Sequence, residues 1–156
     1  MSWKRLNGQP LSDHIVNEVE RVIKAEKALG HRLKVYIGTD SQTYGEAVHF
    51  ATVIVFLREK KGGFMFVNKE RVVRQMGLRE RMILEVHRSV QTAYSICDVL
   101  DKYDVGLEVH ADINTDPDFE SNVALKEAMG YIMAMGFEFK AKPDAFASTS
   151  CADKLV

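Results

Sequence analysis

The sequence has few cysteines and no long hydrophobic run, and each of these absences argues against a class of protein. Cys97 and Cys151 are the two cysteines among 156 residues, and neither belongs to a Cys-x-x-Cys pair or lies at zinc-ligand spacing from a histidine. They are too few for a disulfide framework. The longest apolar stretches, residues 51–57 and 132–135, are far shorter than the roughly 20 residues of a membrane-spanning helix. Because no charged-then-apolar leader opens the chain, we expect a cytoplasmic protein without a membrane partner.

Motifs of several common catalytic centres are also missing. The chain has no glycine-rich phosphate loop, no Ser-His-Asp arrangement and no histidine-rich zinc motif. It contains no internal repeat, linker or low-complexity segment. With 46% hydrophobic and 28% charged residues, the composition is that of a globular protein with a substantial core. We therefore expect one domain over residues 1–156.

The charge of the chain is nearly balanced overall but unevenly distributed. A net charge of -1 argues against strong affinity of the whole surface for nucleic acid. Residues 58–88, however, contain nine Lys or Arg against four Glu, a net +5, whereas residues 98–127 contain nine acids against two Lys, a net -7. Such asymmetry could orient a polyanion over one face of the protein. The alternative is a solvated hairpin followed by a solvated helix.

The order of apolar patterns predicts an α/β protein with one mixed sheet. Ser12 and Asp13 are predicted to cap an N-terminal helix that ends at Gly30, so that residues 1–30 form a helical extension. Three extended runs follow, and their short glycine-containing links favour an antiparallel meander. A long helix, a strand, a second helix, a short strand and a terminal helix complete the order. The predicted elements are 33–39, 48–57 and 64–67 (extending toward 73) for the meander, then 78–103, 107–113, 121–135, 137–140 and 145–156.

Four acids lie where charge is unfavourable for folding. Asp40 and Asp112 end apolar strand-like runs, and Glu85 and Asp153 lie on apolar helix-like segments. A carboxylate desolvated among like charges takes up a proton unless cations hold it ionised, and hard divalent cations choose oxygen ligands. The placement predicts a Mg²⁺ or Mn²⁺ site. Each acid also has a structural alternative, because Asp is common at turns and a Glu at a helix rim is most often solvated.

The two strand-ending acids are predicted to meet. A crossover from one strand through a helix to the next strand is right-handed and yields parallel neighbours. The strand before Asp112 can therefore lie parallel to one of the meander strands. If that neighbour is the strand before Asp40, the two carboxylates come close enough to share a cation. Ser89 is small, so the long helix that carries Glu85 can approach a strand closely there.

Short motifs surround the four acids in a specific order. They are Ile37-Gly38-Thr39-Asp40-Ser41-Gln42, Leu78-Arg79-x-Arg81, His110-x-Asp112-Ile113-Asn114, Gly130-Tyr131 with Met135-Gly136-Phe137, Lys142-Pro143 and Ala152-Asp153-Lys154. Their order over residues 33–156 resembles the ribonuclease H-like superfamily, and within it the YkuK-type branch. The resemblance implies a five-stranded sheet in which the first three strands are antiparallel and the fourth and fifth run parallel to the first.

The resemblance also implies a role for each acid. Active members of the superfamily hold two divalent metal ions with four acids. By position, Asp40 would bridge both ions and Asp153 would hold the ion on the nucleophile side, while Glu85 and Asp112 would complete one side of the site. Two ions roughly 4 Å apart activate water for attack on a phosphodiester and stabilise the leaving 3′ oxygen. The implied activity is a nuclease acting on RNA, RNA/DNA hybrid or structured nucleic acid.

Other residues are candidates for supporting roles. His110 shares a strand face with Asp112 and is a secondary candidate for a general acid or a supporting donor, although a strand histidine is more often merely hydrogen-bonded. Lys142 is a secondary candidate for contact with the scissile phosphate. The arginines of the long helix have an alternative as solvent-facing partners of acids such as Glu80. The predicted nucleic-acid-binding residues are Lys60, Lys61, Lys69, Arg71, Arg74, Arg79 and Arg81.

Two classes of function are compatible with these features. The first is a metal-dependent nuclease, whose partner is nucleic acid of unspecified type. The second is a binding module for nucleic acid or protein that has kept the fold and lost turnover. An ATP-binding protein is a weaker third interpretation, because the actin-like ATPases share the expected sheet topology but their second phosphate loop and doubled domain are absent here.

Overall fold

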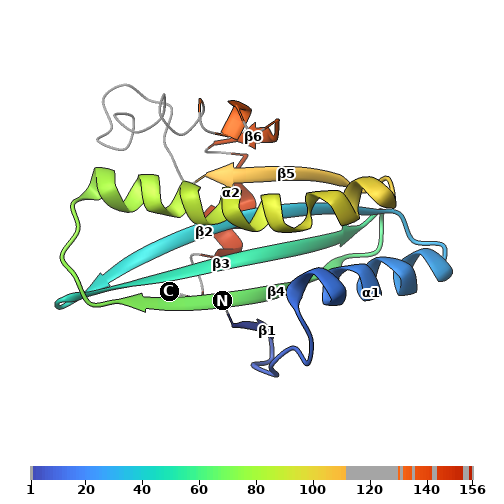
Figure 1. The fold of residues 1–156 in the computed structure, drawn as a ribbon, viewed down its shortest axis with the longest axis horizontal. Helices are drawn as coiled ribbons and strands as arrows, with labels where there is room; N and C mark the ends of the chain where they lie inside the picture. Colours follow the sequence, from blue (N-terminus) through green and yellow to red (C-terminus); the bar gives the residue numbers. More distant parts are fainter. Residues whose placement is uncertain are drawn as a thin grey trace.

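A mixed six-stranded sheet forms the centre of the structure (Figure 1). The computed structural model describes residues 2–111, 130, 132–134, 136–141, 144–152 and 155. The strand order across the sheet is β1-β4-β3-β2-β5-β6. The elements are β1 (Trp3–Arg5), α1 (Ile15–Ala28), β2 (Leu33–Tyr44), β3 (Ala47–Arg58), β4 (Gly63–Val72), α2 (Leu78–Lys102), β5 (Gly106–Ala111), β6 (Glu138–Lys140) and η1 (Ala147–Ala152).

The strand directions confirm the predicted topology, but the predicted number of strands is wrong. β2, β3 and β4 form an antiparallel meander, and β5 and β6 run parallel to β2. The sixth strand is β1, which pairs antiparallel with β4 at the edge of the sheet through Trp3, Lys4 and Arg5. The first 30 residues therefore contribute a strand as well as a helix. Three residues are too short for a readable periodicity, and the partner strand lies more than sixty residues later.

One face of the sheet is covered by α1 and α2 (Figure 1). Every third or fourth residue of α2 is apolar or small, so one stripe of the helix is buried. Ser89 approaches β2 closely, as expected, and its Oγ lies 2.7 Å from Thr39 Oγ1. α1 is capped by His14, whose Nδ1 accepts a hydrogen bond from the Val16 N–H, and not by Ser12 or Asp13 as predicted. In the described part of the chain, no helix has the length and apolar character needed to cross a membrane.

The opposite face of the sheet carries η1, a short π-helical segment (Figure 1, red, behind the sheet). Ala147 and Ala152 are fully buried against Val53 and Val67 of the central strands. Small side chains allow this segment to lie close to the sheet. Most of the predicted helix 121–135 and part of the predicted helix 145–156 lie outside the described residues.

β2 is longer than predicted and does not end at Asp40. Its pairing with β3 continues to Tyr44 opposite Ala47, and the hairpin closes at Gly45 with a φ of 60°, which glycine adopts without strain. The residues between are polar, so no apolar alternation marks this part of the strand. Asp40 nevertheless lies at a boundary, because the described pairing of β2 with β5 ends at Thr39 opposite Ala111.

Candidate active site

Asp40 lies on the central strand β2, and its side chain is directed to the sheet face that carries η1. Alternate side chains of a strand point to opposite faces. Thr39 and Ser41 contact α2, so Asp40 between them faces the other side. The residue is 5% exposed, and its Oδ1 accepts the Ser41 N–H at 2.9 Å. Asp40 is therefore a buried acid at the centre of the sheet.

Glu85 approaches the same position from α2. It is 3% exposed, and its Oε2 accepts a hydrogen bond of 2.5 Å from Ser41 Oγ. Arg81, one turn earlier on α2, donates from Nε to Ser41 Oγ at 3.1 Å and from Nη2 to the Ser41 carbonyl at 2.9 Å. A serine hydroxyl has one proton and two lone pairs. Because a lone pair receives the Arg81 N–H, the single Ser41 proton is directed at Glu85.

The acids of a strand and a helix thus reach one residue, Ser41, from opposite faces of the sheet. Buried carboxylate oxygens are the ligand type that Mg²⁺ and Mn²⁺ select, so Asp40 and Glu85 fit the predicted metal. The other two predicted ligands, Asp112 and Asp153, lie outside the described residues, as does Lys142. Within the residues that are described, no three His, Cys, Asp or Glu side chains form a group that could hold a metal ion.

The register of β5 supports the predicted meeting of the two strands. β2 and β5 are adjacent and parallel, and Thr39 pairs with Ala111. Each of these residues immediately precedes a predicted ligand, Asp40 in one strand and Asp112 in the other. The prediction that the strands leading to these acids are parallel neighbours is confirmed.

His110 anchors η1 to the sheet. It is buried on β5, and its Nδ1 accepts the Ala147 N–H at 3.2 Å, which leaves the ring proton on Nε2 to donate to Glu108 Oε1 at 3.2 Å. The ring also packs against Tyr36 and Phe146. Both ring nitrogens are engaged with protein atoms. This geometry matches the alternative in which His110 is merely hydrogen-bonded. It also ties the first residue of η1 to β5.

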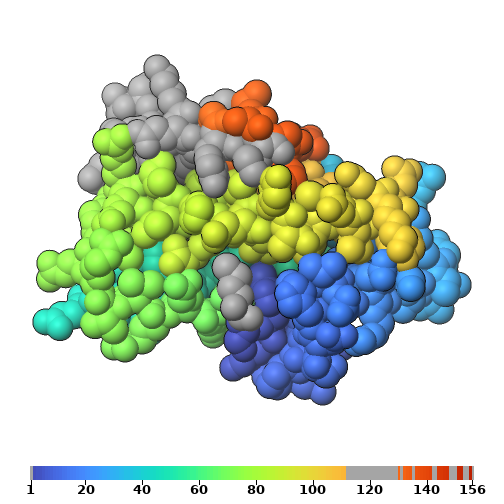
Figure 2. Space-filling view, in the orientation of Figure 1, coloured from blue at the N-terminus to red at the C-terminus, as the bar shows by residue number. Residues whose placement is uncertain are grey.

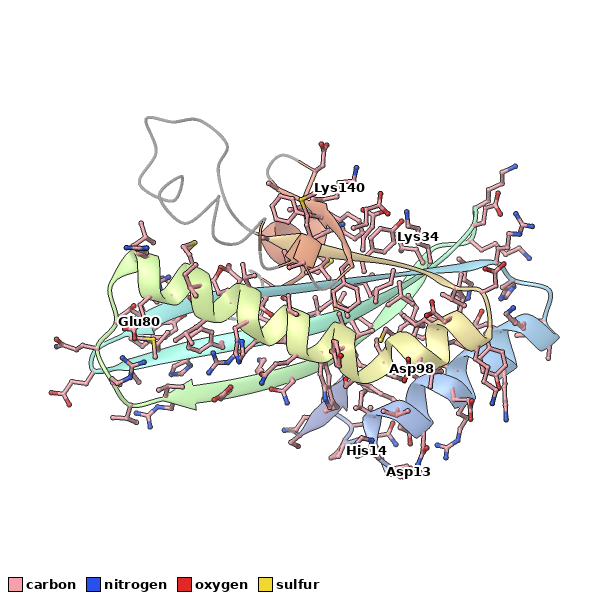
Figure 3. The ribbon with its side chains drawn as sticks, turned by 45° about the horizontal axis from the view of Figure 1, so that its top comes forward. Asp13, His14, Lys34, Glu80, Asp98 and Lys140 are labelled. Atoms are coloured by element: carbon pink, nitrogen blue, oxygen red, sulfur yellow. The ribbon has the colours of Figure 1, made fainter. Side chains whose placement is uncertain are left out.

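Burial favours the neutral form of His110, and hydrogen bonds favour the ionised form of Glu108. Burial lowers the pKa of His110, and the neighbouring Glu108 offsets this only in part. Burial raises the pKa of Glu108, but hydrogen bonds from Lys34 and His110 outweigh burial, so the pKa is lowered. Lys34 forms the ion pair with Glu108 from the adjacent strand. In Figure 3, Lys34 lies at one end of the sheet and Glu80, in the first turn of α2, at the other.

The predicted basic residues do not form one continuous surface. Lys69 of β4 pairs with Ala51, which pairs with Asp40, so Lys69 lies two strands, or about 10 Å, from Asp40. Lys60 and Lys61 lie in the turn after β3, nine and ten residues beyond Ala51, which is about 30 Å away along an extended strand. Sequence neighbours are therefore separated by the length of the sheet.

Most arginines of the basic stretch are engaged within the protein. Arg74 pairs with Glu80 at 2.7 Å, and Arg81 holds Ser41. Arg88, a further arginine of α2, makes two hydrogen bonds to Glu70 and lies over the Phe50 ring. These contacts favour the alternative in which the arginines pair with groups of the protein over one in which they form a surface that binds phosphate. Arg79 lies in the first turn of α2.

Sequence reasoning gave Ser41 no role, although it is the residue that both acids contact. The motif Thr39-Asp40-Ser41 contained it. Its hydroxyl faces α2 because β2 continues past Asp40, and that continuation was not predicted. No alternation in the sequence marks Ser41, because residues 41–43 are all polar.

Comparison with known proteins identifies the class. Residues 14–156 match the family described as Ribonuclease H-like, so the chain belongs to the ribonuclease H-like family. The relative named Uncharacterized protein YkuK, from Bacillus subtilis (strain 168), is 33% identical over 134 residues, which cover 77% of each chain. That identity supports the YkuK-type assignment. A structure of RNase H1 from Halobacterium salinarum NRC-1 has a TM-score of 0.36 at 16% identity, over 73% of this chain and 89% of that chain, and at this level it carries no argument.

Proposed function

We propose that the protein is a metal-dependent nuclease that hydrolyses phosphodiester bonds of RNA, RNA/DNA hybrid or structured nucleic acid. The observation that carries the proposal is the convergence of two buried acids, Asp40 and Glu85, on Ser41. Membership of the ribonuclease H-like family supports it. Burial of an acid is unfavourable unless hydrogen bonds or a cation compensate its charge.

In this proposal the four acids would supply the carboxylate oxygens that hold two Mg²⁺ or Mn²⁺ ions. Asp40 would serve both ions, Glu85 and Asp112 would complete one side, and Asp153 would serve the side of the attacking water. The chemistry supplied by bound ions is a lowered pKa of that water and charge stabilisation of the leaving oxygen. Ser41, held by Arg81, fixes the orientation of the Glu85 carboxylate through the 2.5 Å hydrogen bond. His110 holds the start of η1, the segment that precedes Asp153 in the chain.

We also propose that residues 1–156 act as one domain. Trp3 of β1 and Val19 and Ile23 of α1 belong to the same buried cluster as the central strands and α2. The N-terminal extension would therefore be needed for a stable fold.

The test is cleavage of a panel of labelled RNA, DNA, hybrid and junction substrates with Mg²⁺, Mn²⁺ or chelator. Asp40→Asn should abolish cleavage, whereas the matched variant Asp98→Asn, at an exposed position near the far end of α2 (labelled in Figure 3), should retain it. In thermal melts without metal, Asp40→Asn should equal or exceed wild type, because the amide relieves repulsion among the acids. With metal it should gain less, by ligand linkage.

Two results would contradict the proposal. Preserved cleavage by Asp40→Asn would remove this residue from the mechanism, and a much lower melting temperature in chelator would make Asp40 a structural residue. Metal-dependent stabilisation without cleavage of any substrate would favour the alternative, a catalytically silent binding module.

A further inference from the structure

The hairpin of β2 and β3 extends beyond β5 and leaves a sheet end beside Asp40. β2 pairs with β3 as far as Tyr44, five residues past the last described pair between β2 and β5. Figure 1 shows the hairpin reaching beyond the tip of β5, and Figure 2 shows its tip (turquoise) projecting at the left edge of the molecule. β4 runs beside β3 through Val72, so this end is three strands wide.

The register places a row of polar side chains on one face of this sheet end. Residues directly opposite one another in antiparallel strands share a face. Gln42 pairs with His49, and His49 pairs with Arg71. This row lies two residues further along the strands, about 7 Å, than the row that contains Asp40 and Lys69. Both rows face the side on which Asp40 lies.

Tyr44 adds an aromatic ring to the same face. Its ring centroid is 4.9 Å from that of His49, with the planes tilted by 59°. Contact with His49 orients the tyrosine ring, yet the residue is 52% exposed, which is unusual for so large a side chain. Tyr44 lies four positions beyond Asp40 on β2, a distance of about 13 Å along the strand.

The two cations of this face are exposed and unengaged. Lys69 and Arg71 make no hydrogen bond or ion pair with any residue that the structure describes. Glu70, between them in sequence, points to the opposite face and is paired with Arg88. Glu46, in the exposed hairpin turn, is the nearby acid that opposes the positive charge.

We infer that this hairpin surface, consisting of Gln42, Tyr44, His49, Lys69 and Arg71, binds a single-stranded segment of nucleic acid that leads away from Asp40. A base stacks on Tyr44, and Lys69 and Arg71 contact phosphates. Exposed aromatic rings combined with cations along one track are the chemistry that binds single strands. A base within a duplex already has both faces stacked, so an exposed ring favours an unpaired base. The inference rests on the proposed function and adds the form of its substrate.

The test is equilibrium binding, in chelator so that no cleavage occurs, of a fluorescent single-stranded oligonucleotide and of the blunt duplex of the same sequence. Tyr44→Ala should weaken binding of the single strand by about tenfold and leave the duplex within twofold, whereas Tyr44→Phe should bind both as wild type does. Glu46→Gln should tighten binding of both by less than about threefold, because it removes an opposing charge.

Charge is tested by two matched double variants. Lys69→Gln with Arg71→Gln should weaken single-strand binding at least about tenfold and flatten its salt dependence. Lys60→Gln with Lys61→Gln removes the same charge at the other end of the same strands and should change neither quantity. Thermal melts of each variant check folding.

Three outcomes would overturn the inference: no binding of single strands by the wild type, equal losses in the two double variants, or a Tyr44→Ala effect that is absent or equal for the duplex. A separate assay, cleavage in the presence of metal, tests the proposed nuclease activity. Variant-sensitive binding without cleavage would reject the nuclease alone, and cleavage with unaffected binding in Tyr44→Ala would reject the hairpin surface alone.

Discussion

Two buried glutamates, Glu26 and Glu85, lie on helices against the same face of the sheet, and they are held in different ways. Glu26 accepts hydrogen bonds from Arg58 at 2.7 and 2.8 Å and contacts His31 at 2.5 Å. The Arg58 hydrogen bonds lower the pKa of Glu26 to about 2 despite its burial. Glu85 accepts a hydrogen bond from the hydroxyl of Ser41, to which Arg81 also donates.

Burial of an acid does not by itself identify a functional site. Glu26 is 7% exposed and Glu85 is 3% exposed, so burial does not separate them. Their described donors differ. Glu26 accepts hydrogen bonds from the guanidinium of Arg58, which fastens α1 to the end of β3, whereas Glu85 accepts a hydrogen bond from the hydroxyl of Ser41.

The same substitution at the two positions should give opposite results. Glu85→Gln should reduce metal-dependent cleavage by about a thousandfold or more, about 4 kcal/mol of transition-state stabilisation, and should leave stability in chelator unchanged or higher. Glu26→Gln should leave cleavage per folded molecule unchanged and cost about 2 to 3 kcal/mol of folding free energy, because Arg58 loses its partner. Urea denaturation and cleavage assays measure both. Equal destabilisation by the two variants would remove the distinction.

The pH dependence of stability tests the ion pair that Glu26 forms with Arg58. The folded pKa of Glu26, about 2, lies below its ordinary value of 4.5. The stability of wild type relative to Glu26→Gln is therefore fully present above about pH 5 and is lost as the pH falls from 4.5 through 2, a change of up to about 3 kcal/mol. Denaturation curves at pH 6, 4 and 3 should show the gap closing. A gap that does not vary with pH contradicts the ion-pair assignment.

Ser41 is the residue that should connect Glu85 to activity. Ser41→Ala should lower the metal-dependent cleavage rate by about tenfold to a hundredfold, because the Glu85 carboxylate loses the donor that orients it. The apparent metal affinity, measured by titration of activity, should fall with it. Thr43→Ala removes a hydroxyl from the same face of β2 one step further and is the control, expected to be active. Full activity of Ser41→Ala would show that Glu85 does not depend on this contact.

The smallest effect is expected at Ser89, next to the site but without a role in it. Ser89→Ala removes the 2.7 Å contact with Thr39, whose hydroxyl still lies 3.0 Å from Thr52 Oγ1. We expect a loss of about 1 kcal/mol of stability and cleavage within twofold of wild type. A large loss of activity at equal stability would extend the site into this hydroxyl cluster.

Apolar runs in the sequence predicted the main strands. Acids within apolar segments stood out because burial is unfavourable for a charge. Asp40 and Glu85 stood out as charges within apolar elements, and both are buried. The handedness of the crossover predicted that β5 runs parallel to a meander strand, and the two strand-ending acids predicted that this strand is β2. Contacts between helices and strands were not predicted. The contact of Ser41 with Glu85 depends on how α2 lies along β2, and no periodicity in the sequence encodes that placement.

The basic stretch shows why proximity in sequence was a poor guide to surface. Residues 58–88 include a turn, a whole strand and the start of a helix, so their side chains go to both faces and both ends of the sheet. Lys60 and Lys69 are separated by most of a strand length. A net charge counted along the chain averages over faces that a ligand contacts separately.

The position of β1 has a consequence for the order in which the chain folds. Trp3 pairs opposite Asn68, 65 residues later, so β1 is synthesised well before its partner strand. At a synthesis rate of about 5 to 20 residues per second, β1 waits roughly 3 to 13 s before that partner exists. During that interval the indole of Trp3, which is buried in the folded protein, has no sheet to cover it.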